Sequence, residues 1–277
     1  MKIFTLIEDS RKEHSGLAVE HGLSLYFKQG GKRILFDTGA SDLFVYNATL
    51  MGIDLSKVDI CVISHAHNDH TGGLKHFLEL NSKAKVYMRK EAAEDYYIKR
   101  AFKFRKAGID SKVFERYSDR IVFLEQDAEI AEGVFAASID KHRSYPGFTS
   151  LMYKMKDSKL VRDDLAHELF LAVKGREGVV VLTGCAHKGV LNILMTAKEK
   201  FGDIKGVIGG FHLDGKERFG IMRKSVPDME LNAISKYINN NRIKNVYTGH
   251  CTGERGQERL ELFARVKKLY AGKVIEI

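Results

Sequence analysis

The sequence predicts an α/β protein, because short apolar runs that read as buried strands alternate with segments whose apolar residues recur at helical spacing. Its 277 residues fit either one large domain or two small ones. The chain shows no linker that would split it, so we expect one domain over residues 1–277. A content of 44% hydrophobic and 29% charged residues is ordinary for a globular protein and agrees with this class.

The first half of the chain supplies strands and helices in alternation. Strands are predicted at 3–7, 23–28, 33–37, 60–63 and 84–88, and helices at 41–51 and 73–80. The turn Gln29-Gly30-Gly31-Lys32 joins two of the strands as a hairpin. Ser41 is a candidate cap for the first helix, because its hydroxyl can accept a hydrogen bond from a backbone N–H of the first turn.

The middle of the chain is strongly basic. We predict that residues 89–120 form a basic helical insertion, with cations at Arg100, Lys103, Arg105, Lys106, Lys112 and Arg116. Three short strands should follow near 121–124, 128–130 and 134–137, whereas residues 138–167 show no regular pattern. Much of the formal charge of +9 lies in the insertion, and a solvated helical face is favoured over a binding surface as its explanation.

The second half repeats the alternation of strands and helices. Strands are predicted at 169–173 and 178–182, at 207–213 and 245–253 with their exit loops, and at 273–275. One helix should carry Val190, Ile193, Leu194 and Ala197 on its buried face. Two further helices should be anchored by Leu231 and Leu260, and Pro227 suits the first turn of the earlier one.

Composition argues against several kinds of partner. No apolar segment approaches the ~18 residues that cross a bilayer, and the N-terminal segment does not resemble a secretion signal. We therefore expect a cytoplasmic protein without a membrane partner. Cys61, Cys185 and Cys251 are an odd number of cysteines in a large chain, so no disulfide framework is expected. Nucleic-acid binding would be favoured by aromatic residues interleaved with cations on strands, and because the basic stretch is predicted to be helical we expect no such partner.

One short stretch concentrates the candidate chemistry. Residues 63–73 read Ile-Ser-His-Ala-His-Asn-Asp-His-Thr-Gly-Gly and close a predicted buried strand. Four possible metal ligands fall together there, namely His65, His67, Asp69 and His70. Imidazole suits zinc and related ions, and the carboxylate adds charge that can hold a second dication. No helix or strand could place all four on one face, whereas a tight loop can turn them towards one centre.

With this H-x-H-x-D-H pattern the sequence is similar to the metallo-β-lactamase superfamily. The resemblance implies a four-layer αβ/βα sandwich that binds one or two divalent metal ions, zinc first, with manganese or iron as alternatives. It also places Asp37, in Phe36-Asp37-Thr38-Gly39, beneath the metal loop, where its carboxylate would support the ligands. Without the resemblance, a turn-forming role for Asp37 is an equal interpretation.

Three histidines of the second half share one context, the end of an apolar strand beside glycine. They are His187 in T-G-C-A-H, His212 in G-G-F-H-L and His250 in T-G-H-C-T-G. In α/β sheets, active-site groups gather outside the carboxyl ends of the strands. Together with Glu20-His21-Gly22, these motifs resemble the branch of the superfamily labelled 7,8-dihydropterin-6-methyl-4-(β-D-ribofuranosyl)aminobenzene-5′-phosphate synthase.

The resemblance assigns a role to each of these residues. A first ion would be held by His65, His67 and His187, and a second by Asp69, His70 and His250. Asp69 would also be the catalytic carboxylate, and His212 would face the substrate. No aspartate stands at the bridging position, which Cys185 occupies, and the roles of Cys185, His142 and His21 stay open. The remaining histidines outside the motifs are expected at the surface: His14, His76 and His167.

These residues predict a metal-dependent hydrolase that directs activated water at a small anionic or phosphorylated substrate. One alternative is the synthase reaction of the branch label, which joins a pterin to a phosphoribosyl-aminobenzene unit with the metals as Lewis acids. The other is a non-catalytic protein that binds a metal or a ligand, and the intact loop motif argues against it. The sequence leaves the oligomeric state open.

Overall fold

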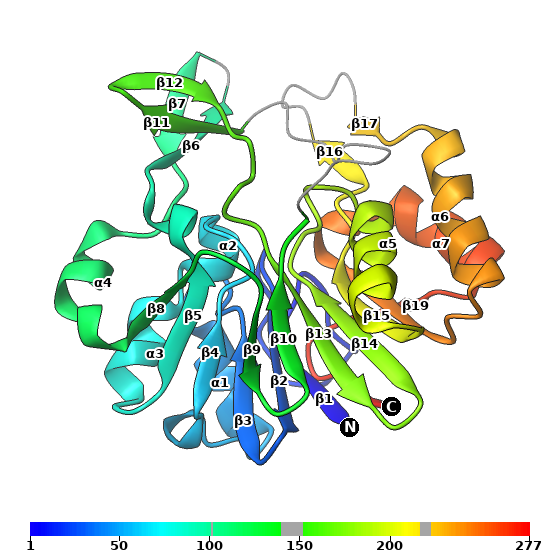
Figure 1. The fold of residues 1–277 in the computed structure, drawn as a ribbon, viewed down its shortest axis with the longest axis horizontal. Helices are drawn as coiled ribbons and strands as arrows, with labels where there is room; N and C mark the ends of the chain where they lie inside the picture. Colours follow the sequence, from blue (N-terminus) through cyan, green and yellow to red (C-terminus); the bar gives the residue numbers. More distant parts are fainter. Residues whose placement is uncertain (101, 140–151, 217–222) are drawn as a thin grey trace. The chain divides into compact units, whose positions relative to one another are not determined.

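The computed structural model of the protein describes residues 1–100, 102–139, 152–216 and 223–277 (Figure 1). His142, one of the open candidates, lies outside these residues. The chain divides into two compact units. The first comprises Met1–Gln126, Ser150–Leu169 and Tyr270–Glu276, and the second comprises Asp127–Thr149, Phe170–Leu269 and Ile277. The expectation of one domain over residues 1–277 stays a prediction.

A seven-stranded mixed sheet forms the centre of the first unit. Its strands, in spatial order, are β20 (Val274–Glu276), β1 (Lys2–Ile7), β2 (Ser24–Gln29), β3 (Lys32–Phe36), β4 (Ile60–Val62), β5 (Lys85–Arg89) and β8 (Ile121–Leu124). Strands β3, β4, β5 and β8 are parallel to their neighbours in that order. Their carboxyl ends therefore lie at one edge, where the loops after β3 and β4 carry Asp37 and the histidine motif.

Four α-helices accompany this sheet: α1 (Leu43–Leu50), α2 (Asn68–Thr71), α3 (Leu74–Leu80) and α4 (Ser111–Arg116). Phe44 of α1 and Phe77 of α3 are fully buried in one apolar cluster with the sheet. Burying a side chain of this kind stabilises the fold by roughly 1.5–3 kcal/mol. The N-cap residue of α1 is Asp42 rather than Ser41, but the Ser41 hydroxyl does accept a hydrogen bond from the Leu43 N–H at 3.2 Å.

The basic insertion is built mainly of strands, so the helical prediction for residues 89–120 is wrong. β6 (Tyr96–Arg100) and β7 (Lys103–Lys106) form a hairpin. They join β11 (Met152–Lys156) and β12 (Lys159–Arg162) in a four-stranded antiparallel sheet of order β12-β11-β6-β7 (Figure 1, upper left). Among the described residues of that stretch, the helical ones are limited to α4 and the 3-10 turns η2 (Lys90–Ala93) and η3 (Ser118–Arg120). Aromatic and β-branched residues in β6 favour a strand, and its partner β11 comes from the segment that showed no regular pattern.

A second seven-stranded mixed sheet forms the centre of the second unit. Its strands, in spatial order, are β19 (Lys267–Lys268), β18 (Asn245–Gly249), β15 (Ile204–Gly210), β14 (Gly178–Thr183), β13 (Phe170–Gly175), β10 (Val134–Ala137) and β9 (Ala128–Ala131). Strands β14, β15 and β18 run parallel, so the loops that follow them leave one edge of the sheet. A separate ribbon consists of β16 (Asp214–Lys216) and β17 (Arg223–Ser225).

The helices of the second unit are α5 (Val190–Phe201), α6 (Asp228–Asn240) and α7 (Gly253–Ala264), with the 3-10 turn η4 (His250–Thr252) before α7. The predicted apolar face of α5 is buried at Val190, Ile193, Leu194 and Ala197. Pro227 is the N-cap residue of α6 and lies just before its first turn. In the parts of the chain that the structure describes, none of the helices combines the length and the apolarity needed to cross a bilayer.

Candidate metal centre

The loop after β4 brings three imidazole rings together in the first unit. The side chains of His65 and His70 are fully buried and that of His67 is nearly so. The ring centroid of His65 lies 4.7 Å from that of His67 and 4.2 Å from that of His70. The histidines are spaced unevenly, and α2 begins within the motif at Asn68, so the chain turns sharply enough to converge them. The predicted cluster of loop histidines is therefore present.

Each of these histidines has one ring nitrogen engaged by a partner outside the cluster. His65 Nδ1 lies 2.8 Å from Ser64 Oγ, and His70 Nδ1 lies 2.7 Å from Asp37 Oδ2. His67 Nε2 lies 3.5 Å from Asp163 Oδ2. A histidine that binds a metal through one nitrogen commonly uses the other for such a partner, which fixes its tautomer and ring orientation. If a metal ion binds at this cluster, the arrangement would present Nε2 of His65, Nδ1 of His67 and Nε2 of His70 to it.

Asp37 makes the predicted contact with the metal loop. Its carboxylate is fully buried, and besides the His70 ring it accepts hydrogen bonds from the Ser64 N–H and the Ser64 hydroxyl, both at 2.7 Å. Its backbone has a φ of 59°, a left-handed conformation that aspartate tolerates better than most residues. One carboxylate therefore holds both the start of the loop and a histidine ring.

We expect Asp37→Ala to weaken metal affinity by roughly 10- to 100-fold, the usual effect of removing a partner that orients a ligand. The dissociation constant is measured by competition with a chelator. Asp37→Asn is the second variant, because it keeps the shape of the side chain if the alanine variant is unstable. Asp42→Ala, at an exposed aspartate five positions later, is the matched control and should leave the affinity unchanged. Unchanged affinity in both Asp37 variants would leave Asp37 as a turn residue only.

Two residues beneath the loop, Asp163 and His167, escaped the sequence analysis. His167 is fully buried, so the expectation that it lies at the surface is wrong, whereas His14 and His76 are exposed as expected. Its Nδ1 accepts the Ala66 N–H at 3.0 Å, and its Nε2 lies 3.0 Å from Asp163 Oδ2. The two residues are four positions apart, directly before a buried strand. That spacing of a carboxylate and an imidazole was the only available signal.

Asp163 connects His167 to the metal loop electrostatically. Burial alone would raise the pKa of its carboxyl, but the hydrogen bond with His167 and the nearby imidazole of His67 outweigh burial and hold that pKa below its usual value. An ionised Asp163 favours a proton on the His67 nitrogen that faces it, so that Nδ1 of the same ring would be the nitrogen able to bind a metal.

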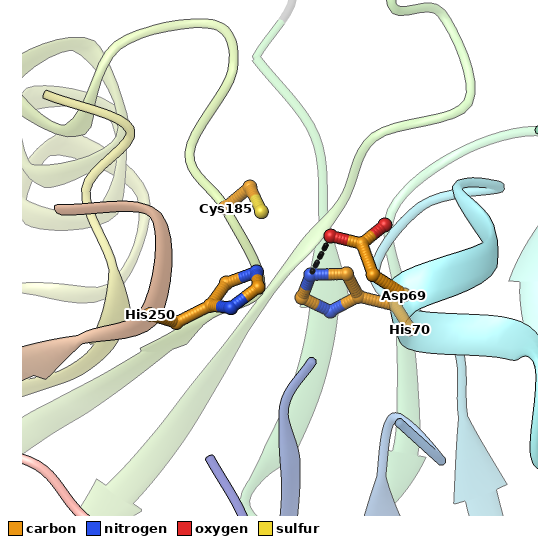
Figure 2. A group of neighbouring side chains, drawn as sticks. All are labelled: Asp69, His70, Cys185 and His250. Atoms are coloured by element: carbon orange, nitrogen blue, oxygen red, sulfur yellow. Dashed lines mark ion pairs between the residues drawn. The ribbon is translucent and has the colours of Figure 1, made fainter. Parts of the chain in front are cut away.

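Asp69 lies between two imidazoles. Its Oδ2 is 3.7 Å from His70 Nε2 (Figure 2) and 3.7 Å from His21 Nε2. The other ring nitrogen of His21 lies 2.7 Å from Asp9 Oδ2, and the His21 side chain is 64% exposed. Asp69 is thus the partly exposed acid of the loop, and His21, whose role was open, lies beside it.

Glycine is required where the helices after the loop meet the segment that follows β3. A Cβ on Gly72 would lie 2.1 Å from the Ala40 carbonyl oxygen, and one on Gly73 would lie 2.2 Å from that of Thr38. The pair Gly72-Gly73 therefore lets α2 and α3 pack directly on the loop that carries Asp37.

The second unit gathers its candidate residues at three neighbouring strand exits. Cys185 and His187 follow β14, His212 follows β15 and His250 follows β18. The rings of His187 and His212 are 4.1 Å apart, and Figure 2 shows Cys185 and His250 on their separate exit loops. His212 and His250 both have a φ of 49°, so each chain turns sharply at its histidine.

The thiol of Cys251, to which the sequence assigned no role, belongs to this group. The Cys251 Sγ lies 3.6 Å from the Cys185 carbonyl oxygen, and the ligand atoms of Cys185, His212 and Cys251 lie within 4.8 Å of one another. Cys185, whose role was open, is buried, and so is Cys251. Only its place beside His250 distinguished Cys251 in the sequence.

The donor set of the first unit fits a divalent metal ion. Three convergent imidazoles, each oriented by an outer partner, together with a nearby carboxylate, are the ligands that zinc and related ions take in proteins. His65 and His70 also fall within one group of possible ligand atoms that lie within 4.8 Å of one another, which includes the carboxylate of their supporting residue Asp37.

Known proteins resemble this chain over its whole length. A protein of Methanocaldococcus jannaschii described as uncharacterized protein MJ0448 is 31% identical over 267 residues, covering 93% of this chain and 94% of that protein. A second protein of that organism, named 7,8-dihydropterin-6-methyl-4-(beta-D-ribofuranosyl)-aminobenzene-5'-phosphate synthase, is 27% identical over 304 residues and covers 100% of this chain and 96% of that protein.

A solved structure is also similar to this one. It is described as Tm1679, a metal-dependent hydrolase of the beta-lactamase superfamily, and aligns with a TM-score of 0.83 and 34% identity over 100% of this chain and 99% of that one. Residues 18–157 match the profile of the family described as the metallo-beta-lactamase superfamily. The predicted family and α/β fold are confirmed, apart from the helical insertion. The chain belongs to the metallo-β-lactamase superfamily.

Proposed function

We propose that the protein is a metal-dependent hydrolase of a small anionic or phosphorylated substrate. The observation that carries the proposal is the convergence of three loop histidines, each with one ring nitrogen held by Ser64, Asp37 or Asp163. Sites that hold their ligands this firmly keep the geometry that metal-assisted catalysis needs. The 34% identical relative of solved structure is described as a metal-dependent hydrolase, which supports the same class.

Within this proposal the ligands keep their predicted assignment. His65, His67 and His187 would hold one ion, and Asp69, His70 and His250 a second. When bound, such ions, zinc first among them, lower the pKa of a coordinated water towards ~7 and polarise the group that it attacks. Support from the second unit is limited to the burial of His187 and His250 at the ends of parallel strands.

The residues of the chain divide the remaining work. Asp69 would orient the attacking water and accept its proton, since it is the partly exposed carboxylate of the loop. His21 Nε2 lies 3.7 Å from Asp69 Oδ2, and its ring would help to hold that carboxylate in place. His212 would donate a hydrogen bond to an anionic oxygen of the substrate, which is worth roughly 1.5–3 kcal/mol for a charged partner.

The test is hydrolysis of an activated phosphodiester, bis(p-nitrophenyl) phosphate, by protein that has been stripped with a chelator and reloaded with zinc, manganese or iron. We expect turnover that requires the metal and falls by roughly 100-fold or more in Asp69→Asn, since a positioned general base contributes about 10²–10⁴-fold. Asp42→Asn, at an exposed aspartate, should retain full activity. Metal-independent turnover, or equal activity in both variants, would contradict the proposal.

The same assay separates the hydrolase from the synthase alternative. The synthase is favoured by one observation, the name of the 27% identical relative that covers the whole chain. A dedicated synthase should leave the activated phosphodiester intact while consuming a pterin and a phosphoribosyl-aminobenzene compound together. Consumption of that pair with no phosphodiester cleavage would replace the hydrolase with the synthase.

A further inference from the structure

The sheet of β12, β11, β6 and β7 carries an unusual charge. Of its 18 strand residues nine are Lys or Arg and none is Asp or Glu. The nine are Lys99, Arg100, Lys103, Arg105, Lys106, Lys154, Lys156, Lys159 and Arg162. The whole chain has 45 basic and 36 acidic residues, so without these nine the numbers would be equal. The number of cations on this one sheet therefore equals the formal net charge of the whole chain, +9.

Most of these cations are not neutralised within the protein. Lys106 pairs with Asp95 at 2.8 Å, and Lys154 pairs with Glu94 and Asp164. By contrast, five of them have no carboxylate within 4.0 Å among the residues that the structure describes: Lys99, Lys103, Arg105, Lys156 and Lys159. The register also places Lys156 opposite Lys159, and like charges that face each other across strands are destabilising. This cost to the fold points to an anionic partner that offsets it.

Aromatic rings lie among the cations on one side of the sheet. Strand alternation and register place eight side chains on this side, which we call the aromatic face: Tyr97, Lys99, Phe104, Lys106, Tyr153, Met155, Leu160 and Arg162. The rings of Phe104 and Tyr153 are 5.0 Å apart at 85°. Lys99 Nζ lies 5.8 Å from the Phe104 ring centre, and Arg162 Cζ lies 5.7 Å from that of Tyr153. Rings and cations thus alternate at close range.

The sheet begins beside the metal loop. Tyr96, the first residue of β6, is buried with its ring edge-on to that of His67 at a centroid distance of 6.4 Å. Ala107, which follows β7, donates to the Tyr96 carbonyl and accepts from the Asn68 N–H, both at 2.8 Å. Within the first unit, the sheet that carries the aromatic face is therefore joined directly to the histidine cluster.

We propose that the aromatic face binds single-stranded nucleic acid. The cations would neutralise backbone phosphates, and the rings and the Arg162 guanidinium would stack with unpaired bases. A duplex would satisfy only the cations, because its bases are already stacked on one another. An anionic membrane surface would likewise satisfy the cations, but it offers no unpaired bases to stack on the rings. The sequence argued against a nucleic-acid partner because the basic insertion was expected to be helical. The insertion forms strands instead, so that argument no longer applies.

Binding is measured by fluorescence anisotropy with a labelled single-stranded oligonucleotide of about 12 nucleotides, within the range of known site sizes. We expect affinity that falls steeply between about 50 and 200 mM salt. Phe104→Ala and Tyr153→Ala should each weaken binding by roughly 5- to 150-fold, the range for one stacked base. No binding at the lower salt concentration would overturn the proposal.

Two triple variants remove the same charge from opposite sides of the sheet. Lys99→Gln/Lys106→Gln/Arg162→Gln empties the aromatic face of cations, and the control Lys103→Gln/Arg105→Gln/Lys159→Gln acts on the other face. The first should weaken binding and reduce the slope of log affinity against log salt by about two, since each phosphate contact on a single strand contributes ~0.7. The control should change both much less. Equal losses would mean unspecific charge attraction and overturn the proposal.

Two comparisons complete the experiment. Duplex of the same length, or vesicles containing anionic lipid, that bind as tightly as the single strand would also overturn the proposal, and tight vesicle binding would indicate a membrane surface in its place. The oligonucleotide is measured with His65→Ala as well. We expect unchanged binding there, because this surface does not depend on the proposed metal chemistry. Binding lost in His65→Ala would contradict the proposal, whereas loss of hydrolysis alone would not.

Discussion

His65→Ala and His67→Ala should each remove most of the metal from the purified protein. For the native chain we expect roughly one to two equivalents of a zinc-like ion, since the loop ligands suit two ions but no aspartate stands at the bridging position. The ring of His65 lies against those of His67 and His70, and each of the three has a buried partner. If the assignment holds, loss of one imidazole would remove a direct ligand and a ring that packs within the cluster. Metal content is measured by elemental analysis after purification without added metal.

His76→Ala is the matched control, because His76 is an exposed histidine on α3, just beyond the loop. It should keep the native metal content. His187→Ala and His250→Ala should each lower the content by about one equivalent or less, because each would supply one ligand to one ion. Full metal retention in both His65→Ala and His67→Ala would refute the assignment of the loop as the metal centre.

The site residues that could be predicted are those that lie close together in the sequence in a recognisable motif. His65, His67, Asp69 and His70 fall within six positions after an apolar strand, so the cluster was visible before any fold was known. Asp37 was recognised through its motif, and its hydrogen bonds with Ser64 and His70 give the contact a physical basis. The effect of Asp37 on metal affinity stays a prediction.

Structural features that depend on contacts between distant parts of the sequence could not be predicted. Lysine and arginine suit an exposed helix well, so the cation-rich residues 99–106 gave little local sign that they pair in a sheet. The strand partner of β6 is β11, and that pairing depends on a contact between distant parts of the chain. Asp163 and His167 were missed for the same reason, because they contact His67 and Ala66 only in the folded chain.

His167→Ala should lower the free energy of unfolding by about 3 kcal/mol or more, although His167 belongs to none of the recognised motifs. The substitution removes the imidazole that donates a hydrogen bond through Nε2 to the buried Asp163 carboxylate, and leaving a buried acceptor unsatisfied costs about 1–3 kcal/mol, more when the acceptor is charged. It also leaves the Ala66 N–H without its acceptor and opens space beside Tyr96, whose ring centre is 4.2 Å from that of His167.

The measurement is urea unfolding of metal-free protein, so that any change in bound metal does not contribute. The midpoint should fall while the slope with denaturant concentration stays the same, which reports lost stability rather than a changed unfolded state. His76→Ala should stay within about 0.5 kcal/mol of the native chain, as an exposed substitution does. A loss below about 1 kcal/mol in His167→Ala would show that Asp163 and Ala66 find other partners, and that His167 does not support the metal loop. A loss of the expected size would place His167, with Asp37, among the buried residues that hold the loop before any metal binds.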